Sequence, residues 1–401
     1  MSLRSLIEGA DIAPLLMVTV QLSGDRAELA RYRPYLQGPW NWMHDVPPAL
    51  KTRLYDRSAA LIEAIRSGRE APAPAPDHAL LAEMVSTCVG QPVPEEYLPL
   101  IAHEMGLAGT PPLEVDWRAG PPHRALADFQ VVIIGAGESG LAAAIKLARL
   151  GIRYTIIEKN RTVGGTWFEN RYPGCGVDTP NHFYQYSFAP NHAWSRYFAQ
   201  RDELWRYLEG VTDRYQVRPH IRFNTEVTDA VWLEDTARWR IQARDASGAM
   251  IELHANALVC AVGQLNRPRL PDIAGLRSFA GPAMHTAQWD DSVALDGRRV
   301  AMIGTGASGM QVGPSIVDRV ARLSIFQRSP HWAVHNPLYH AVVDAGKKWA
   351  LANLPHYASW YRFQLFWASA DGLHASLHVD PDWPTPDLSL NAANHAMRER
   401  L

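Results

Sequence analysis

The chain has 401 residues, a formal net charge of −2, 47% hydrophobic residues and 20% charged residues, which is the balance of an ordinary soluble globular protein. This near-neutral charge argues against a nucleic-acid-binding surface, so we expect no nucleic-acid partner. No apolar run approaches the length of a membrane span, so we expect no membrane association. The three cysteines lie far apart without a C-x-x-C, which favours a reduced, cytoplasmic protein with neither disulfides nor a metal site.

Residues 1–127 are predicted to form a helical N-terminal extension. Its start, residues 1–22, is interpreted as an amphipathic helix rather than a signal peptide, because acidic residues and a proline interrupt the apolar patch. Residues 57–68 have apolar side chains at helical spacing, and Asp77 is a predicted N-cap. No residue of this block is expected to carry chemistry. We expect a unit for packing or oligomerisation, with a homodimer through these helices as one outcome.

A dinucleotide-binding pattern starts at Phe129, in "FQVVIIGAGESG". A short apolar run is followed by Gly135, Gly137 and Gly140, then by a helix and a second apolar run that ends at Glu158. A G-x-G-x-x-G between a strand and a helix, with an acid at the end of the next strand, predicts a nucleotide site. The pyrophosphate would lie at the helix N-terminus, and Glu158 would accept the ribose hydroxyls. The alternative is a purely structural glycine turn.

The pattern recurs in residues 298–330, without the acid. Arg328 stands at the end of the second apolar run, where a guanidinium would attract a 2′-phosphate, so this unit is predicted to prefer NADP(H). The alternative for Arg328 is a surface charge. The candidate cofactor-binding residues of this second unit are Gly304, Gly306, Ser308, Gly309, Arg328 and Ser329.

Two such units predict an α/β protein with two Rossmann-like dinucleotide-binding domains, one for FAD and one for NADPH, preceded by the helical extension. The FAD-binding domain is predicted over 128–270 and is expected to be incomplete. The NADPH-binding domain is predicted over 271–401 and ends in a helical, Trp-rich tail. Hinges between the two are expected near 264–271, in a Pro-rich crossover.

Two further stretches carry a family resemblance. Residues 163–188 read "VGGTWFENRYPGCGVDTPNHFYQYSF", and residues 279–290 read "FAGPAMHTAQWD". Both resemble the type I Baeyer–Villiger monooxygenases, whose fingerprint F-x-G-x-x-x-H-T-x-x-W-[P/D] is filled at every position. Within that family the chain is most similar to 4-hydroxyacetophenone monooxygenase. Flavin-containing N- and S-oxygenases lack the Thr and Trp, and flavin reductases that act on disulfides need a cysteine pair where only Cys175 stands.

The resemblance implies an NADPH- and FAD-dependent enzyme that uses O2 to convert a ketone into an ester or lactone, and it favours aryl or bulky ketones. It implies that Gly164, Gly165, Thr166 and Trp167 follow the flavin, and that Tyr184 and Val227 make further FAD contacts. Asp178 matches a carboxylate beneath the flavin ring that would orient a cation, the alternative being a loop cap.

The same resemblance makes Asp178 and His285 the candidate catalytic residues. For His285, a hinge and hydrogen-bonding role between the two domains is favoured over proton transfer. The family's catalytic Lys-Arg segment has no match, since Lys347 and Lys348 are not followed by Arg. The open alternatives are therefore a truncated, non-oxygenating nucleotide-binding fragment and a heteroatom oxygenase. Oxygenation is expected to be absent or uncoupled unless another cation, such as Arg171, supplies the charge.

Overall fold

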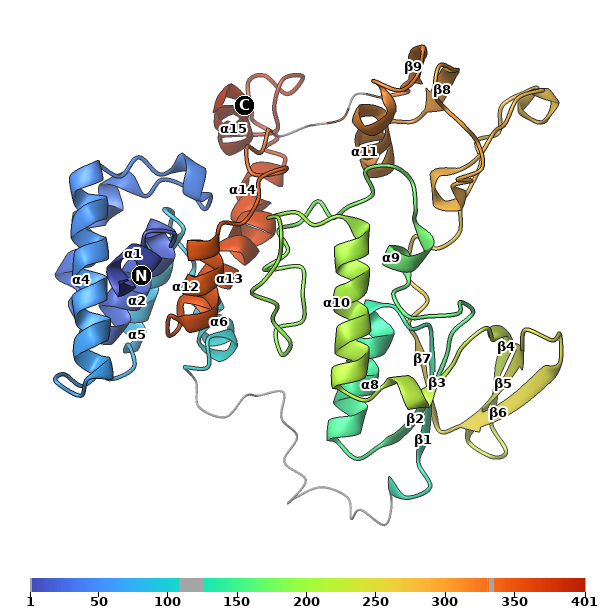
Figure 1. Cartoon of the computed structure of the whole chain (residues 1–401), viewed down its shortest axis with the longest axis horizontal. Helices are drawn as coiled ribbons and strands as arrows, with labels where there is room; N and C mark the ends of the chain where they lie inside the picture. The colour runs from blue at the N-terminus through green and yellow to red at the C-terminus, as the bar shows by residue number, and fades with distance from the viewer. Residues whose placement is uncertain (1, 108–125, 330, 332–334, 401) are drawn as a thin grey trace. The chain divides into compact units, whose positions relative to one another are not determined.

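The computed structural model describes residues 2–107, 126–329, 331 and 335–400. The chain divides into two compact units, and Figure 1 labels most of their helices and strands. Unit 1 comprises Met1–Glu114, Thr179–Phe198 and Ala333–Leu401, and unit 2 comprises Val115–Asp178 and Ala199–Trp332. Each unit therefore gathers segments that are distant in the sequence.

The centre of unit 1 is α2 (Ile12–Ser23), in which every residue from Ile12 to Leu22 is buried. Its sequence, IAPLLMVTVQLS, is apolar on all sides, so the helix has no face suited to water and lies among its neighbours. The prediction of one amphipathic helix over residues 1–22 is therefore wrong. The segment forms the short α1 (Leu3–Ile7) followed by this core helix, which ends at Gly24 with a left-handed φ of 70°.

The other helices between Ser23 and Leu107 belong to the same core, as the extension was predicted to be helical. Asp77 is an N-cap as predicted, since its carboxylate accepts the amide N–H of Leu80 at 2.8 Å. These helices are α3 (Ala27–Tyr32), α4 (Pro48–Arg66), α5 (His78–Cys88) and α6 (Leu98–Glu104).

Helices from the C-terminal part of the sequence complete this core. Trp360 of α13 is fully buried, and its indole N–H donates to the side-chain oxygen of Gln21 at 2.8 Å. Lys347 of α12 is also fully buried and forms an ion pair with Asp11, the N-cap residue of α2. The C-terminal helices are α12 (Ala345–Asn353), α13 (Tyr357–Ser369), α14 (His374–Leu377) and α15 (Ala392–Arg400).

Unit 2 contains a parallel sheet with the strand order β3-β2-β1-β7. Strands β1 and β2 of this sheet are joined by α8 (Glu138–Arg149), which buries Leu141, Ala144 and Ile145 and packs against the sheet. A longer helix, α10 (Arg201–Arg214), precedes β3 in the chain. The strands are β1 (Gln130–Ile134), β2 (Arg153–Ile157), β3 (Ile221–Arg222) and β7 (Ala257–Cys260). This order confirms the first predicted strand–helix–strand unit.

An antiparallel sheet with the order β4-β5-β6 packs against the parallel one. Ile241 and Ala243 of its central strand form a core cluster with Val132 and Ile157 of the parallel sheet. The three strands are β4 (Glu226–Leu233), β5 (Arg238–Arg244) and β6 (Met250–Ala255).

The second glycine-rich unit forms β8 (Arg299–Ile303), α11 (Ala307–Ile316) and β9 (Arg322–Phe326). The two strands pair in parallel, with Ile303 opposite Phe326. This strand–helix–strand order confirms the second predicted unit and, with it, the α/β class. The second strand ends at Phe326, slightly before the predicted end at Arg328.

Short turns complete the described chain. The short helix α9 (Thr166–Glu169) follows the first unit. The 3₁₀ turns are η1 (Arg33–Tyr35), η2 (Asn41–Met43), η3 (Glu95–Tyr97), η5 (Arg218–His220), η6 (Leu276–Ser278), η7 (Thr286–Gln288) and η8 (Asp371–Leu373). Across the described ranges, no helix has both the length and the apolar character needed to cross a membrane. The domain boundaries at 127/128 and 270/271 stay predictions.

Candidate functional site

The first glycine-rich loop connects β1 to α8 and requires glycine at two positions. Gly135 has a φ of 102°, which side chains rarely adopt. A Cβ at Gly140 would lie 1.9 Å from the carbonyl oxygen of Gly135, so no larger residue fits there without a backbone shift. Gly137 is the N-cap residue of α8 and has no side chain over the first turn of the helix. The loop thus exposes backbone N–H groups at the start of a helix, where an anion is favoured.

Glu158 follows the end of β2, and its side chain lies against this loop. Its side chain is 4% exposed, and its two carboxylate oxygens accept the backbone N–H groups of Ala136 at 2.7 Å and Asn160 at 2.8 Å. Each oxygen retains a further lone pair for another donor. The predicted acid is therefore fixed beside the glycine-rich loop, where it can also accept a ligand hydroxyl.

The "GGTW" turn lies directly against the same loop. The amide N–H of Gly164 donates to the carbonyl of Ala136 at 3.0 Å, and a Cβ at Gly137 would lie 3.5 Å from the Cα of Gly165. Gly164 and Gly165 both have positive φ, 122° and 50°. Thr166 then begins α9, which buries Trp167. The structure therefore brings the residues of the first glycine-rich loop and the "GGTW" residues together.

The second loop repeats the first in backbone geometry. Gly304 has a φ of 101°, and a Cβ at Gly309 would lie 2.8 Å from the Gly304 carbonyl oxygen. Among the described residues, no atom lies within 4 Å of a Cβ built at Gly304 or Gly306, so the approach to this loop is open. Ser308 is half-buried in the first turn of α11.

Arg328 and Ser329 follow the end of β9 and are exposed. In the described part of the chain, Arg328 forms no ion pair that would neutralise its guanidinium. Arg328 lies two residues beyond the end of β9, one position further along than Glu158 lies beyond β2, and it carries the opposite charge.

The remaining predicted residues lie neither in these two loops nor in the helices and strands that flank them. Asp178 is exposed at the end of a unit 2 segment, Tyr184 is half-buried in unit 1, and Val227 is half-buried in β4. His285 is the N-cap residue of η7, and its Nδ1 accepts the amide N–H of Ala287 at 3.1 Å. This contact shows a turn-stabilising role for His285, and the catalytic roles of Asp178 and His285 stay predictions.

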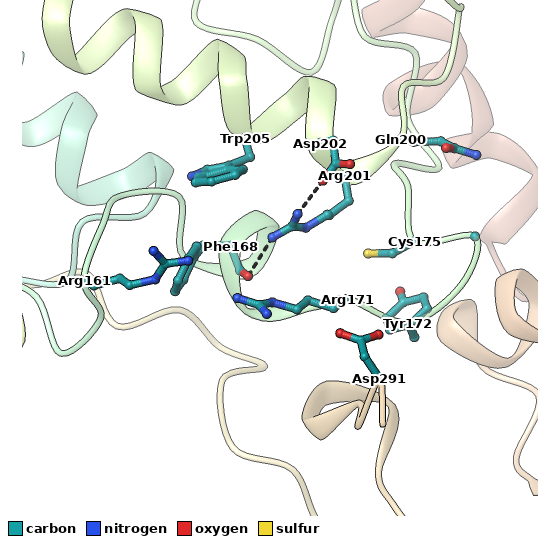
Figure 2. A pocket seen from close by; sticks show the side chains of 11 residues that line it. Arg161, Phe168, Arg171, Tyr172, Cys175, Gln200, Arg201, Asp202, Trp205 and Asp291 are labelled. Carbon is teal, nitrogen blue, oxygen red and sulfur yellow. Dashed lines mark hydrogen bonds and ion pairs between the residues drawn. The ribbon is translucent and has the colours of Figure 1, made fainter. Parts of the chain in front are cut away.

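A polar recess of about 440 Å³ lies beside α9 in unit 2, and Figure 2 shows the side chains that line it. Three arginines reach it: Arg161, Arg171 and Arg201. The thiol of Cys175 also lines it, and burial raises the pKa of that thiol. We name this feature the arginine recess. The other residues around it are Phe168, Tyr172, Gly174, Gln200, Asp202, Trp205 and Asp291.

Gln311 joins the second glycine-rich unit to the "RYPGCG" segment, and the sequence alone does not single it out. From α11, its side-chain N–H donates to the carbonyl of Gly176 at 2.8 Å, and its side-chain oxygen accepts the hydroxyl of Tyr172 at 3.0 Å. Gly174 packs closely on the same helix, since a Cβ there would lie 2.6 Å from the Gln311 carbonyl oxygen. The "RYPGCG" segment is thus held by α11, and only its glycines could have hinted at this close approach.

Comparison with known proteins gives related sequences over most of the chain. A sequence model of the pyridine nucleotide-disulphide oxidoreductase family matches residues 132–355. An uncharacterised monooxygenase of Sinorhizobium fredii is 38% identical over 98% of this chain and 58% of its own length. A Baeyer–Villiger monooxygenase of Streptomyces coelicolor is 45% identical over 51% of this chain and 39% of its own length. The chain thus spans between about two fifths and three fifths of these relatives.

Two solved structures of cyclohexanone monooxygenase are similar as well. One, from Rhodococcus sp. Phi1 and bound to NADP+, is 32% identical, with a TM-score of 0.52 over 67% of this chain and 49% of that one. The other, with ε-caprolactone bound, is 32% identical, with a TM-score of 0.53 over 67% of this chain and 51% of that one.

Proposed function

The chain belongs to the pyridine nucleotide-disulphide oxidoreductase family, and on that premise we propose that it binds FAD and NADPH as a flavin monooxygenase of the Baeyer–Villiger type. The observation that carries the proposal is the pair of glycine-rich loops with matching backbone geometry, φ 102° and 101° at their first glycines. One loop is followed by the buried carboxylate of Glu158 and the other by the exposed guanidinium of Arg328.

FAD fits the first loop. The glycine contacts leave no room for side chains over the start of α8, so backbone N–H groups would receive the pyrophosphate. Glu158 would accept ribose hydroxyls with the lone pairs left by Ala136 and Asn160, which suits a ribose without a 2′-phosphate. Trp167 in the adjoining turn would border the flavin.

NADPH fits the second loop. The space around Gly304 and Gly306 is open, and Arg328 would pair with the 2′-phosphate, assisted by the hydroxyl of Ser329. Gln311 would keep the "RYPGCG" segment in place on the helix that starts at this loop. When bound, the two cofactors would supply the hydride and the oxygen chemistry, while the chain binds and orients them.

The proposed reaction uses O2 to convert an aryl or bulky ketone into an ester or lactone, in a cytoplasmic setting. It is supported by the fingerprint from Phe279 to Asp290 and by relatives named as Baeyer–Villiger monooxygenases. Heteroatom oxygenation and a non-oxygenating fragment gain no support from the names of these relatives. Dimerisation through the N-terminal helices stays a prediction.

The FAD assignment can be tested at Glu158. Glu158→Lys would place a cation against the loop amides and the ribose, so the purified variant should lose most of its flavin absorbance. Glu226→Lys on β4, an exposed glutamate of the same unit, is the matched control and should retain flavin. A folded Glu158→Lys protein with wild-type flavin content would refute this site.

The reaction itself is tested by measuring NADPH consumption, hydrogen peroxide and ester together, with an aryl ketone under ¹⁸O2. Ester carrying one ¹⁸O atom supports Baeyer–Villiger oxygenation. Flavin-dependent NADPH oxidation that yields peroxide alone, across a panel of aryl and bulky ketones, would contradict it.

A further inference from the structure

The arginine recess has an excess of positive charge. Arg161, Arg171 and Arg201 line it with only two carboxylates among the described residues, those of Asp202 and Asp291. Arg201 is already engaged, because it forms an ion pair with Asp202 and donates to the carbonyls of Phe168 and Asn170 at 2.9 and 3.2 Å. The other two arginines account for the excess.

Arg161 and Arg171 flank one buried ring. Their guanidinium carbons lie 5.5 and 5.6 Å from the centroid of the Phe168 ring, which is within the range of cation–π attraction. Within the described residues, neither guanidinium is joined to a carboxylate by an ion pair. Figure 2 shows both arginines beside Phe168 at the recess, where their N–H donors stay available.

A second arginine pair stacks on an aromatic ring outside the arginine recess. Arg149 and Arg214 lie 5.9 and 5.6 Å from the ring centroid of Tyr215 in the same unit. Tyr215 and these arginines do not line the arginine recess. Arg149 and Arg214 therefore serve as a control, because they stack on an aromatic ring in the same way but lie away from the recess.

We propose that the arginine recess binds the phosphate or carboxylate group of an organic anion, held by Arg161 and Arg171. A guanidinium presents planar N–H donors that match either group, and charge-assisted bonds of this kind are the strong ones. The recess volume of about 440 Å³ falls in the range of small-molecule sites, roughly 300–1,000 Å³. Two sources carry such a group here, a nicotinamide nucleotide and an anionic ketone substrate. The proposal rests on the function proposed above and deepens it.

Asp291 allows a second test of the proposal, because removing its charge should strengthen anion binding rather than weaken it. Its carboxylate lines the same recess and forms no ion pair with the three arginines in the described structure. It therefore repels an incoming anion. Asp291→Asn should tighten anion binding by about two- to fivefold.

The experiment titrates the flavin-loaded protein with inorganic phosphate, NADPH, 4-acetylbenzoate and the neutral 4-acetylbenzamide, followed by calorimetry. The double variant Arg161→Gln, Arg171→Gln should bind phosphate about ten- to a hundredfold more weakly. Arg214→Gln should leave it unchanged. Because Arg161 and Arg171 are exposed, folding should persist, and circular dichroism together with flavin content checks it.

The organic ligands identify the source of the anion. Weaker NADPH binding with unchanged 4-acetylbenzoate assigns the group to the nucleotide. Weaker 4-acetylbenzoate binding with unchanged 4-acetylbenzamide assigns it to a substrate. The proposal is overturned if phosphate binding is unchanged, if Arg214→Gln weakens it equally, if neither organic anion is affected, or if Asp291→Asn weakens binding. Since flavin content is measured separately, failure of this site is distinguishable from failure of the FAD assignment.

Discussion

Replacing His182 by phenylalanine should remove much of the acid sensitivity of unit 1. His182 is 3% exposed and packs edge-on against Tyr361, with 5.5 Å between ring centroids. In the described structure neither of its ring nitrogens has a hydrogen-bond partner. Burial, and to a smaller extent the charges of Lys347, His192 and Lys348, lower the pKa of His182 from 6.5 to about 3. The imidazole is therefore neutral in the folded protein near neutral pH.

The sign of the effect follows from this shift. Between pH 6.5 and 3 the unfolded chain binds a proton at His182 that the folded chain does not bind, so the free energy of unfolding falls as the pH falls. The slope approaches about 1.4 kcal/mol per pH unit below pH 6.5, and its integral gives a loss of about 2–3 kcal/mol between pH 6.5 and pH 4.5. A phenylalanine keeps the ring contact and takes up no proton, so the variant should lack this loss.

The assay is urea unfolding followed by tryptophan fluorescence at several pH values from 7 to 4.5, for wild type and His182→Phe. The difference between the two in free energy of unfolding should grow by about 2–3 kcal/mol toward pH 4.5. His78→Phe, at an exposed histidine of α5 in the same unit, is the control and should follow wild type. Parallel pH dependences for wild type and His182→Phe would refute the reasoning.

Three further changes test the loops and the core. Arg328→Ala should weaken NADPH binding about ten- to a hundredfold and leave NADH binding unchanged, with the exposed Arg322→Ala as control; equal losses for both nucleotides would show that Arg328 does not contact the 2′-phosphate. Gly140→Ala should cost about 1–3 kcal/mol of stability and release flavin, because the added Cβ would lie 1.9 Å from the carbonyl oxygen of Gly135. The control Gly210→Ala, in open space on α10, should stabilise the protein by up to about 1 kcal/mol, and equal melting temperatures of the two variants would contradict this reasoning. Lys347→Met should cost about 3–5 kcal/mol because it leaves the carboxylate of Asp11, which is only 11% exposed, without its ion pair; wild-type stability in urea would contradict this value.

The two strand–helix–strand units could be predicted because their signals are local. A short apolar run, three glycines and a helical repeat follow one another closely in the sequence, and the glycines at the turn have a steric reason to be there. Glu158 was identified from its position alone, and the structure places its carboxylate on the loop amides. The burial of α2 could also have been predicted from its sequence, because the segment is apolar on every side.

The rest depends on contacts that no local pattern reveals. Arg161 and Arg201 come together at the recess from separate segments, and each looks like an ordinary surface arginine in the sequence. Gln311 reaches Tyr172 across 139 positions. Lys347 contacts Asp11 across 336 positions, and both residues belong to unit 1. Such pairings follow from the three-dimensional packing of elements rather than from their composition.

The buried bond between Gln21 and Trp360 has a consequence for synthesis on the ribosome. The two residues are 339 positions apart, so α2 is complete long before α13 is translated. At a translation rate of roughly 5–20 residues per second, about 17–70 s would pass between the synthesis of Gln21 and that of Trp360. During that interval the nascent N-terminal helices expose side chains that are buried in the finished protein. Chaperone occupancy of the helices from α1 to α6 should therefore persist until the codons for α13 have been read.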